Sequence, residues 1–574
     1  MKLPDKWGQG ALFAYSGFDG KSPFSNRFSA RLCADKFGLV FSTETDCTLS
    51  IGINDCSDIN FYTVMSDYIK AGIKNGEIEH EVRIVFVSEN TVVIDSDCEI
   101  NVDVIFSGDV SVKKEKSAVC YTSGKEKFAL ASRKTEACSF YAFSYGKNAP
   151  ALAERALEIN IFDEEDKKIA AYSAADNLRI PNADIEKLYY KCISVLRACF
   201  NTSDGLIKYD CISPSKGNMN AMYSFWSALC VLGLRHFAPE AAKNTMEGIL
   251  SSAAADGMIS AKTSASGKDL DISPPILAWC MWELYTVNKD VGMLSAAYSK
   301  LKKYLHYITE TRDINKNQLF EWQISDDMSS FGKESTMDNS PRFDDGIILD
   351  CVDLTSYIAN EAHYMSLIAE ETGKHGEALY WNIVFERIKT AVNSVLFDED
   401  DKIYYDRAVV SGMLKKTKSS AAFLPLFAGI CENRHAMSLL RLLNNEDKFN
   451  LSGGIPSVSR DSEDYSHDMW RGPVHAYINY FIAKGLDKYE MHDKANDIKS
   501  KILETVMSEY CNDGVLYEYY SADPKVAAHT LPKKGKSAAP FIRGEEKVNI
   551  PDFAPTAAMI IDMLLSKSKK MPKN

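Results

Sequence analysis

The sequence lacks any long hydrophobic run and any excess of positive charge. No stretch approaches the roughly 20 apolar residues of a membrane-spanning helix, and the amino-terminal "MKLPDKWGQGALF" is too polar for a signal peptide. Lys and Arg number 66 against 79 Asp and Glu, so the net charge is −13. Because binders of phosphate backbones carry basic stripes, we expect no nucleic-acid partner and no membrane partner. Two short basic stretches, "LPKKGK" and the terminal "KSKKMPKN", are expected to be solvated.

Paired-cysteine motifs are also missing. The 14 cysteines form no CxxC pair, and several lie inside apolar helical patterns, namely Cys192, Cys199, Cys230 and Cys280. This usage is typical of reduced core cysteines rather than of a disulfide or zinc framework, so we expect a cytoplasmic protein. No Gly-rich phosphate loop, Ser-His-Asp elbow or metal-ligand cluster stands out, so we expect no cofactor and no metal.

At 574 residues the chain is too long for one ordinary core. Residues 1–165 alternate apolar and polar positions, most clearly in "EVRIVFVSENTVVIDSDCEINVDVIFSG", which the turn formers "SEN" and "SDC" interrupt. Similar short runs are "FGLVFSTE", "TLSIGIN", "CSFYAFSYG" and "ALEINIF". Such runs predict an N-terminal antiparallel β-sandwich domain over 1–165, followed by a linker over 166–183.

From about residue 184 the period becomes helical. "NADIEKLYYKCISVLRACF" opens with an Asn/Asp cap and repeats apolar residues at helical spacing. Eleven further helices are expected at 219–236, 238–253, 273–288, 292–311, 351–373, 374–396, 417–430, 432–443, 468–485, 486–511 and 554–567. Some, such as "SPPILAWCMWELYTV", are apolar all round and suit an inner ring, whereas others are amphipathic. We therefore expect a mainly α domain over 184–574, folded as an (α/α)6 toroid. A solenoid of helix pairs is the alternative.

Three segments between these helices are long and chemically rich: 312–350, 451–473 and 512–553. Loops beyond about 12–15 residues are usually functional or disordered, and the aromatic residues here, including Trp322, Trp470 and Tyr519, disfavour disorder. The first segment contains "KESTMDNSPRFDDG", which combines acids, cations and an Asn-Ser pair. Flat aromatic faces beside acids and amides suit a sugar ring, although composition alone leaves other polar ligands open.

Several of these stretches resemble a known family. "TMDNSPRFD" resembles the "G-(M/L)-D-(N/D)-S-P-R" loop of glycoside hydrolase family 63 and the mannosylglycerate-hydrolase-like enzymes, which are six-hairpin glycosidases. "MWRGPVHAYINYFIAKGL" is similar to their "WRGP(V/I)W…NY…GL" segment, and weaker similarities cover about residues 185–567 in order. The resemblance implies a toroidal catalytic domain over 184–574. It also implies an inverting, exo-acting hydrolase of α-linked, α-glucoside-like substrates, either oligosaccharides or small α-glycosides.

Inverting hydrolysis needs two carboxyl groups roughly 6.5–9.5 Å apart, one as general acid and one as general base. The resemblance implies that Asp338 is the acid and Glu518 the base. The candidates for substrate binding are Phe225, Trp226, Trp322, Asn339, Arg342, Trp470, Arg471, Asn479 and Tyr519. The sequence departs from the family pattern at Ser227, Ser273 and His475, which alters the expected sugar subsite.

Two other classes stay open. A sugar epimerase or polysaccharide lyase on the same toroid would use a histidine or tyrosine for proton transfer, and His363, His467 and His475 are available. A catalytically inactive glycan-binding homologue is the third reading, although both expected carboxyl groups are retained. The sequence does not indicate how many copies of the chain associate.

Overall fold

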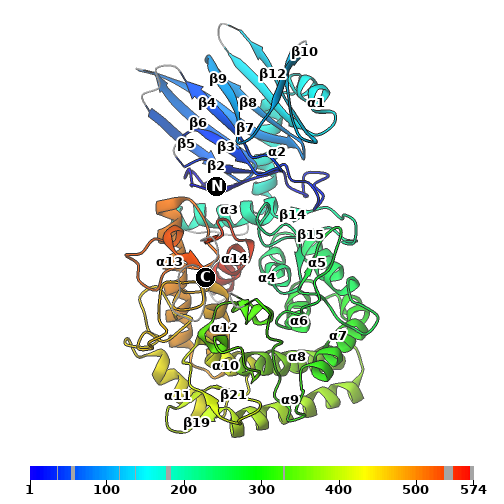
Figure 1. Ribbon diagram of the computed structural model, residues 1–574, viewed down its shortest axis with the longest axis vertical. Coiled ribbons are helices and arrows are strands. Elements are labelled where there is room, and N and C mark those ends of the chain that lie inside the picture. The colour runs from blue at the N-terminus through cyan, green and yellow to red at the C-terminus, as the bar shows by residue number, and fades with distance from the viewer. Residues whose placement is uncertain are drawn as a thin grey trace, which may run out of the picture.

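The structure is a computed structural model that describes residues 1–34, 36–53, 58–75, 77–115, 117–135, 138–175, 182–327, 330–534 and 547–568. Figure 1 shows the strands of the N-terminal part gathered at one end of the molecule and the helices of the remainder at the other. The N-terminus lies at the junction between them.

The N-terminal part contains two antiparallel sheets. The five-stranded sheet has the order β1-β2-β3-β4-β9, with β1 (Leu12–Phe13), β2 (Ala30–Leu32), β3 (Gly38–Phe41), β4 (Cys47–Ile53) and β9 (Ile100–Phe106). The eight-stranded sheet has the order β10-β11-β12-β13-β8-β7-β6-β5, with β5 (Asp58–Val64), β6 (Tyr68–Asn75), β7 (Ile78–Ser88), β8 (Thr91–Ser96), β10 (Ser111–Glu115), β11 (Ala118–Ser123), β12 (Glu126–Lys134) and β13 (Ser139–Tyr145).

Aromatic side chains join the two sheets. Phe41 of β3 lies 5.4 Å from Phe143 of β13 and 6.4 Å from Phe86 of β7, measured between ring centroids. All three rings are buried. The strands predicted in residues 81–108 are confirmed as the end of β7, β8 and β9, because their apolar residues face this core and the predicted breaks fall between them.

The strand predicted at "ALEINIF", residues 156–162, is wrong. This stretch ends helix α1 (Ala149–Ala156) and begins helix α2 (Ile161–Ser173). The Asn160 side chain accepts a hydrogen bond from the Phe162 N–H (3.2 Å), which caps α2. Helix α2 packs on β7 and occupies part of the segment expected as a linker. The rest of that segment, 176–181, lies outside the described residues.

Twelve helices from α3 onward follow in the described part of the chain: α3 (Ala183–Ala198), α4 (Ser224–Leu234), α5 (Pro239–Ser251), α6 (Leu277–Asn288), α7 (Val291–Thr311), α8 (Val352–Glu371), α9 (His375–Val395), α10 (Leu424–Ala428), α11 (Asn433–Leu443), α12 (Ala476–Lys488), α13 (His492–Asp513) and α14 (Ala554–Ser568). The cap predicted for the first is present, because Asn182 accepts from the N–H groups of Asp184 and Ile185. No helix in the described part of the chain has the length and apolarity that crossing a bilayer requires.

The even-numbered helices pack on one another in order, α4 on α6, α6 on α8, α8 on α10, α10 on α12 and α12 on α14, and α14 packs on α4 again. Odd-numbered helices cover them: α5 contacts α4, α7 contacts α6, α9 contacts α8, α13 contacts α12 and α3 contacts α14. Every residue of α4 is buried, as expected for a helix enclosed on all sides.

Buried polar contacts join the sheets to the helices. Asp552, which precedes α14, accepts from the Leu12 N–H of β1 (2.7 Å), the Lys191 ammonium of α3 (2.8 Å) and the Leu516 N–H (3.2 Å). Because both Asp552 and Lys191 are buried, this contact fixes the sheets against the segment that leads into α14.

Candidate active site

A cavity of about 170 Å³ lies where the segments that precede the even-numbered helices meet. Its lining residues are Met219, Tyr223, Phe225, Trp226, Ala261, Lys262, Asp269, Asp271, Ser273, Lys333, Thr336, Asp338, Met469, Glu518 and Lys533. Asp338 comes from the segment before α8 and Glu518 from the segment before α14, so two carboxyl groups that are remote in sequence line one cavity.

The Asp338 loop is closed by its own backbone. Two short 3-10 helices, η2 (Lys333–Ser335) and η3 (Pro341–Phe343), flank Asp338. Thr336 ends η2 in the left-handed conformation (φ 63°), and the Gly332 N–H donates to the Asp338 carbonyl (3.2 Å). This compact loop leaves the Asp338 side chain only partly buried.

Glu518 is held between two other segments. Its N–H donates to the Ile550 carbonyl (3.1 Å), and Tyr520 exchanges two backbone hydrogen bonds with Val474 (2.7 and 2.9 Å). Glu518 is 7% exposed. The backbone therefore fixes where this carboxyl group enters the cavity.

Each carboxyl group binds one of two adjacent lysines. The Lys533 ammonium pairs with Glu518, and the Lys534 ammonium lies 2.7 Å from Asp338 Oδ2. The lysine side chains are 14% and 17% exposed, so the prediction that "LPKKGK" is solvated is wrong for this pair. The other predicted basic stretch, "KSKKMPKN", lies outside the described residues from 569 onward.

Aromatic rings form the apolar side of the cavity. Phe225 and Trp226, from the first turn of α4, line the cavity. Both are among the residues predicted to contact substrate. The Trp226 ring meets Tyr477 edge-on (centroids 5.2 Å apart) and also Phe553 (5.3 Å). Burial raises the pKa of Tyr477 well above its usual value, and its hydroxyl pairs with Thr336 Oγ1 at 3.1 Å.

The other predicted substrate contacts do not line this cavity: Trp322, Asn339, Arg342, Trp470, Arg471, Asn479 and Tyr519, all buried. The Trp322 indole N–H donates to Asp353 (3.0 Å). The Trp470 ring stacks flat on His475, with centroids 3.4 Å apart, and its backbone N–H donates to Asn339 (3.1 Å). These side chains fix the loops rather than presenting a face to the cavity.

Both predicted arginines are tied to carboxylates. Arg342 contacts Asp353 and Asp406 through four hydrogen bonds of 2.7–2.9 Å. Burial disfavours its charge, but the two carboxylates outweigh burial and hold the pKa of Arg342 well above its usual value. Arg471 pairs with Asp344. The planar donors of Arg342 are thus engaged in the core, and these contacts do not support the prediction that Arg342 holds sugar, which stays a prediction.

Two further predicted contacts bind backbone. The Asn479 side chain accepts from the Ile455 N–H (2.8 Å) and donates to the Ile455 carbonyl (3.0 Å). The Tyr519 hydroxyl donates to the Pro532 carbonyl (2.9 Å). Both residues therefore position the segments around the cavity.

The three departures from the family pattern have different locations. Ser273 lines the cavity and pairs with the Ser224 hydroxyl at 2.7 Å. Ser227 is buried and donates to the Ile212 carbonyl at 2.7 Å. Burial lowers the pKa of His475 to about 3, so this ring is neutral.

Sequence reasoning missed the rim residues between α5 and α6. Lys262, Asp269 and Asp271 line the cavity, and Asp271 pairs with Lys333. Tyr223, which directly precedes α4, also lines the cavity and was missed as well. The available signal was the length of this connection, since α5 ends at Ser251 and α6 begins at Leu277.

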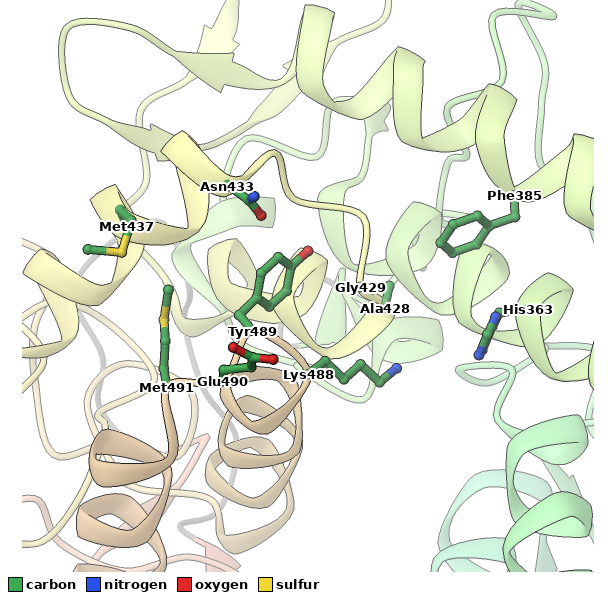
Figure 2. A pocket seen from close by; sticks show the side chains of 10 residues that line it. All are labelled: His363, Phe385, Ala428, Gly429, Asn433, Met437, Lys488, Tyr489, Glu490 and Met491. Carbon is green, nitrogen blue, oxygen red and sulfur yellow. The ribbon is translucent and has the colours of Figure 1, made fainter.

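A larger cavity of about 640 Å³ lies at the opposite end of α12 (Figure 2). Figure 2 shows Lys488 extending from that helix end toward His363. Burial lowers the pKa of His363 to about 4. Glu490 is the one carboxylate among its described lining residues. Because glycoside hydrolysis uses a pair of carboxyl groups, the smaller cavity, where Asp338 and Glu518 meet beside Phe225 and Trp226, is a better candidate active site than this one.

The Asp338 and Glu518 carboxyl groups and an aromatic wall lie around one cavity within a ring of helices, an arrangement that suits glycoside hydrolysis. Residues 221–525 match the family model of the mannosylglycerate hydrolase MGH1-like glycoside hydrolase domain. The chain belongs to this family.

Curated relatives are similar over part of their length. Mannosylglycerate hydrolase MGH1 of Selaginella moellendorffii is 31% identical over 128 residues, which is 22% of this chain and 25% of that protein. An uncharacterized protein of Borreliella burgdorferi is 25% identical over 256 residues, 44% of this chain and 51% of that protein. The chain thus matches about half or less of the length of these relatives.

Two solved structures share the fold. The GH63 mannosylglycerate hydrolase of Thermus thermophilus, in complex with glucose, matches with a TM-score of 0.53 and 18% identity, over 65% of this chain and 99% of that one. A bacterial glucoamylase complexed with acarbose matches with a TM-score of 0.63 and 9% identity, over 99% of this chain and 95% of that one. The second match extends over the strands as well as the helices.

Proposed function

We propose that this glycoside hydrolase is an inverting, exo-acting enzyme on a small α-linked, α-glucoside-like substrate, with Asp338 as general acid and Glu518 as general base. The observation that carries the proposal is that both carboxyl groups line the same cavity. Asp338 would protonate the glycosidic oxygen as the bond to the sugar breaks. Glu518 would remove a proton from the water that attacks the opposite face of the sugar.

The cavity supports an exo mode of action. Its volume of about 170 Å³ is small beside the roughly 300–1,000 Å³ of pockets for drug-sized ligands, and it suits one sugar ring. Phe225 and Trp226 would face the C–H groups of that ring, and the polar rim residues would bind its hydroxyl groups. Because relatives are named mannosylglycerate hydrolases, α-mannosylglycerate is a second substrate to test beside α-glucosides.

We also propose the division of the chain into a β-sandwich over 1–165, a connection over 166–183 and an (α/α)6 catalytic toroid over 184–574. Support comes from the aromatic contacts between the two sheets and from the cyclic packing of the even-numbered helices. Buried thiols such as Cys192, Cys230 and Cys280 support the proposal of a cytoplasmic location, because they suit a reducing compartment.

The alternative function, a sugar epimerase or polysaccharide lyase that uses a histidine or tyrosine for proton transfer, has weaker support. No histidine is present among the described residues that line the cavity, so His363, His467 and His475 all lie outside it. Tyr223 does line it, but burial and then Asp269 raise its pKa to about 12, which makes it a poor base at neutral pH. Retention of both carboxyl groups disfavours an inactive glycan-binding homologue.

The test is a screen of α-linked disaccharides, α-glucosides and α-mannosylglycerate, with the product anomer followed by NMR. We expect the inverted anomer, and we expect Asp338→Asn and Glu518→Gln to lower kcat by about 10²–10⁴-fold. The matched control is Asp345→Asn, which changes a 43% exposed carboxylate in the same loop and should retain activity. A retained anomer contradicts the inverting mechanism. Binding without turnover supports the inactive homologue.

A further inference from the structure

Three side chains of metal-binding type meet at the end of one strand pair in the N-terminal part. His80 lies in β7, and Asp97 and Cys98 lie in the turn between β8 and β9. Their ligand atoms, a ring nitrogen, a carboxylate oxygen and a thiol sulfur, all lie within 4.8 Å of one another. His80 Nδ1 lies 3.3 Å from Asp97 Oδ1. Three different ligand types this close together make the cluster a candidate metal site.

The strand register brings these residues together. β7 and β8 are antiparallel neighbours, and the Asp97 N–H extends their pairing by donating to the Glu81 carbonyl (3.3 Å). The next residues along the two strands, His80 and Cys98, therefore stand opposite each other, where the Cβ atoms of cross-strand pairs are about 4.5–5.5 Å apart. The ligands come from separate strands and form no closely spaced motif, which is why the sequence alone predicts no metal.

Two neighbouring groups orient the ligands. The Glu81 N–H donates to Asp97 Oδ1 (2.9 Å), and the Ser96 hydroxyl lies 3.2 Å from Cys98 Sγ, where it can donate to a thiolate. Outer partners of this kind fix the direction of metal ligands and tune their basicity. The ligands are also within reach of solvent, because the side chains of His80 and Asp97 are 27% and 56% exposed and Cys98 is half-buried.

The chemistry of the donor atoms selects the metal. A thiolate, an imidazole and a carboxylate are the three kinds of side chain that bind zinc, at about 2.3 Å for sulfur and about 2.0–2.2 Å for nitrogen and oxygen. In a tetrahedron with those bond lengths the donor atoms stand roughly 3.3–3.6 Å apart, and the distance between His80 and Asp97 already meets this requirement. Ca²⁺ and Mg²⁺ prefer sites made of oxygen atoms, so the sulfur and nitrogen donors disfavour them.

We propose that His80, Asp97 and Cys98 bind one zinc ion, with a water molecule as the fourth ligand. The Cys98 thiol gives up its proton to solvent when the ion binds. At Asp97 and Cys98 the chain passes from the eight-stranded sheet to the five-stranded sheet, so the ion fastens this connection to the end of β7. The site is separate from the cavity that Asp338 and Glu518 line, and it does not depend on the proposed function.

The other cluster of three such ligands in the described part of the chain does not suit an ion. Cys351, Asp353 and Asp406 are buried, and the Arg342 guanidinium binds both carboxylates through hydrogen bonds of 2.7–2.9 Å. A permanent positive charge thus occupies the place between them. The first cluster instead offers the imidazole of His80, which binds metals in its neutral form.

The test measures zinc binding to the full chain after metal has been stripped with EDTA. Titration with zinc chloride should give one bound ion per chain and a higher Tm, because the ion binds the folded chain. Co²⁺ in its place should give the visible absorption of tetrahedral cobalt and the near-ultraviolet band of a cobalt–thiolate bond. Cys98→Ser and His80→Gln should each weaken zinc binding by more than the roughly 10–100-fold that loss of an outer partner costs.

Two substitutions are matched controls. Cys138→Ser removes an exposed thiol from another turn of the eight-stranded sheet, between β12 and β13. His492→Gln removes a ring from an exposed pair with Asp487 (2.9 Å), which belongs to no cluster of three metal-binding side chains among the described residues. Both variants should keep the zinc affinity and the cobalt spectrum of the wild type.

Zinc that binds Cys98→Ser as tightly as the wild type would lie elsewhere in the chain and would overturn the proposal. Failure of the wild-type chain to take up zinc would also overturn it, as would a cobalt spectrum without the thiolate band. Equal Tm values for the metal-free wild type and metal-free Cys98→Ser show that lost binding reflects the lost ligand rather than unfolding. If Cys98→Ser lowers the metal-free Tm, His80→Gln decides by the same criteria.

Discussion

At the scale of single residues, Arg342 illustrates how a motif residue can serve the site without touching the cavity. Its guanidinium joins the Asp338 loop to Asp353 of α8 and to Asp406, and all three side chains are buried. Removing one partner of a buried ion-pair network costs about 3–5 kcal/mol, since the remaining charges lose their compensation. We expect Arg342→Met to lower the free energy of unfolding by that amount, measured by urea denaturation.

The matched control for Arg342→Met is Arg434→Met. Arg434 also pairs with two carboxylates, but its side chain is 62% exposed, so water replaces the lost contacts. An equal effect of the two substitutions would show that the buried network does not hold the Asp338 loop.

The resemblance to the family's motifs carried the prediction of Asp338 and Glu518, and the adjacent aromatic pair Phe225 and Trp226 also lines the cavity. The same reasoning missed Lys533 and Lys534, because a basic pair beside proline and glycine looks like a solvated turn. Whether such a pair meets solvent or a carboxylate depends on which loops the fold brings together. Local sequence does not contain that information.

At the scale of elements, helix existence was easier to predict than helix starts. The predicted 219–236 and 468–485 begin as α4 at Ser224 and as α12 at Ala476. Apolar, buried residues lie before each start, Ala221 and Met222 before α4 and Met469, Trp470 and Val474 before α12, so the helical pattern extends through them. They nevertheless form a short strand (β16, Met222–Tyr223) and the loop around Trp470. In these residues, tertiary contacts around the cavity, rather than the helical pattern of the sequence, determine the backbone conformation.

The start of α6 depends on Glu361 of α8. This buried carboxyl group accepts from the N–H groups of Ala278 (2.7 Å) and Trp279 (3.0 Å), in the first turn of α6. Burial raises the pKa of Glu361 to about 7 from 4.5, although the backbone N–H groups oppose the shift. The folded chain thus binds one more proton than the unfolded chain between about pH 4.5 and 7. The contribution of Glu361 to stability is therefore present below pH 4.5 and is lost as pH rises through 7.

We expect Glu361→Gln to remove this pH dependence. The free energy of unfolding of the wild type should fall more steeply than that of the variant between pH 5 and 7, by on the order of 1.4 kcal/mol per pH unit. Urea denaturation at several pH values measures the difference. The control is Glu370→Gln, an exposed carboxylate on the same helix. Parallel curves for wild type and Glu361→Gln would contradict the assignment.

At the scale of the whole molecule, the sequence predicts which segments are strands, helices and long loops, but not how the loops converge. The segments that carry Asp338, Met469 and Glu518 precede different helices, and they meet because the even-numbered helices close on themselves. The junction with the sheets adds a further constraint on Glu518, since its N–H bonds to Ile550, two residues before Asp552.

Asp552 therefore couples the position of the sheets to the candidate active site. In Asp552→Asn, the buried Lys191 ammonium loses its carboxylate, which should lower the free energy of unfolding by about 3–5 kcal/mol. Because the segment 549–552 also positions Glu518, kcat should fall while KM changes less.

Asp5→Asn is the matched control for Asp552→Asn. Asp5 also joins the N-terminal part to α3, through Lys187, but both side chains are about a quarter exposed (27% and 24%). That pair is worth about 0–1 kcal/mol. If both variants unfold with the same free energy and keep wild-type kcat, the buried contact does not transmit the position of the sheets to Glu518.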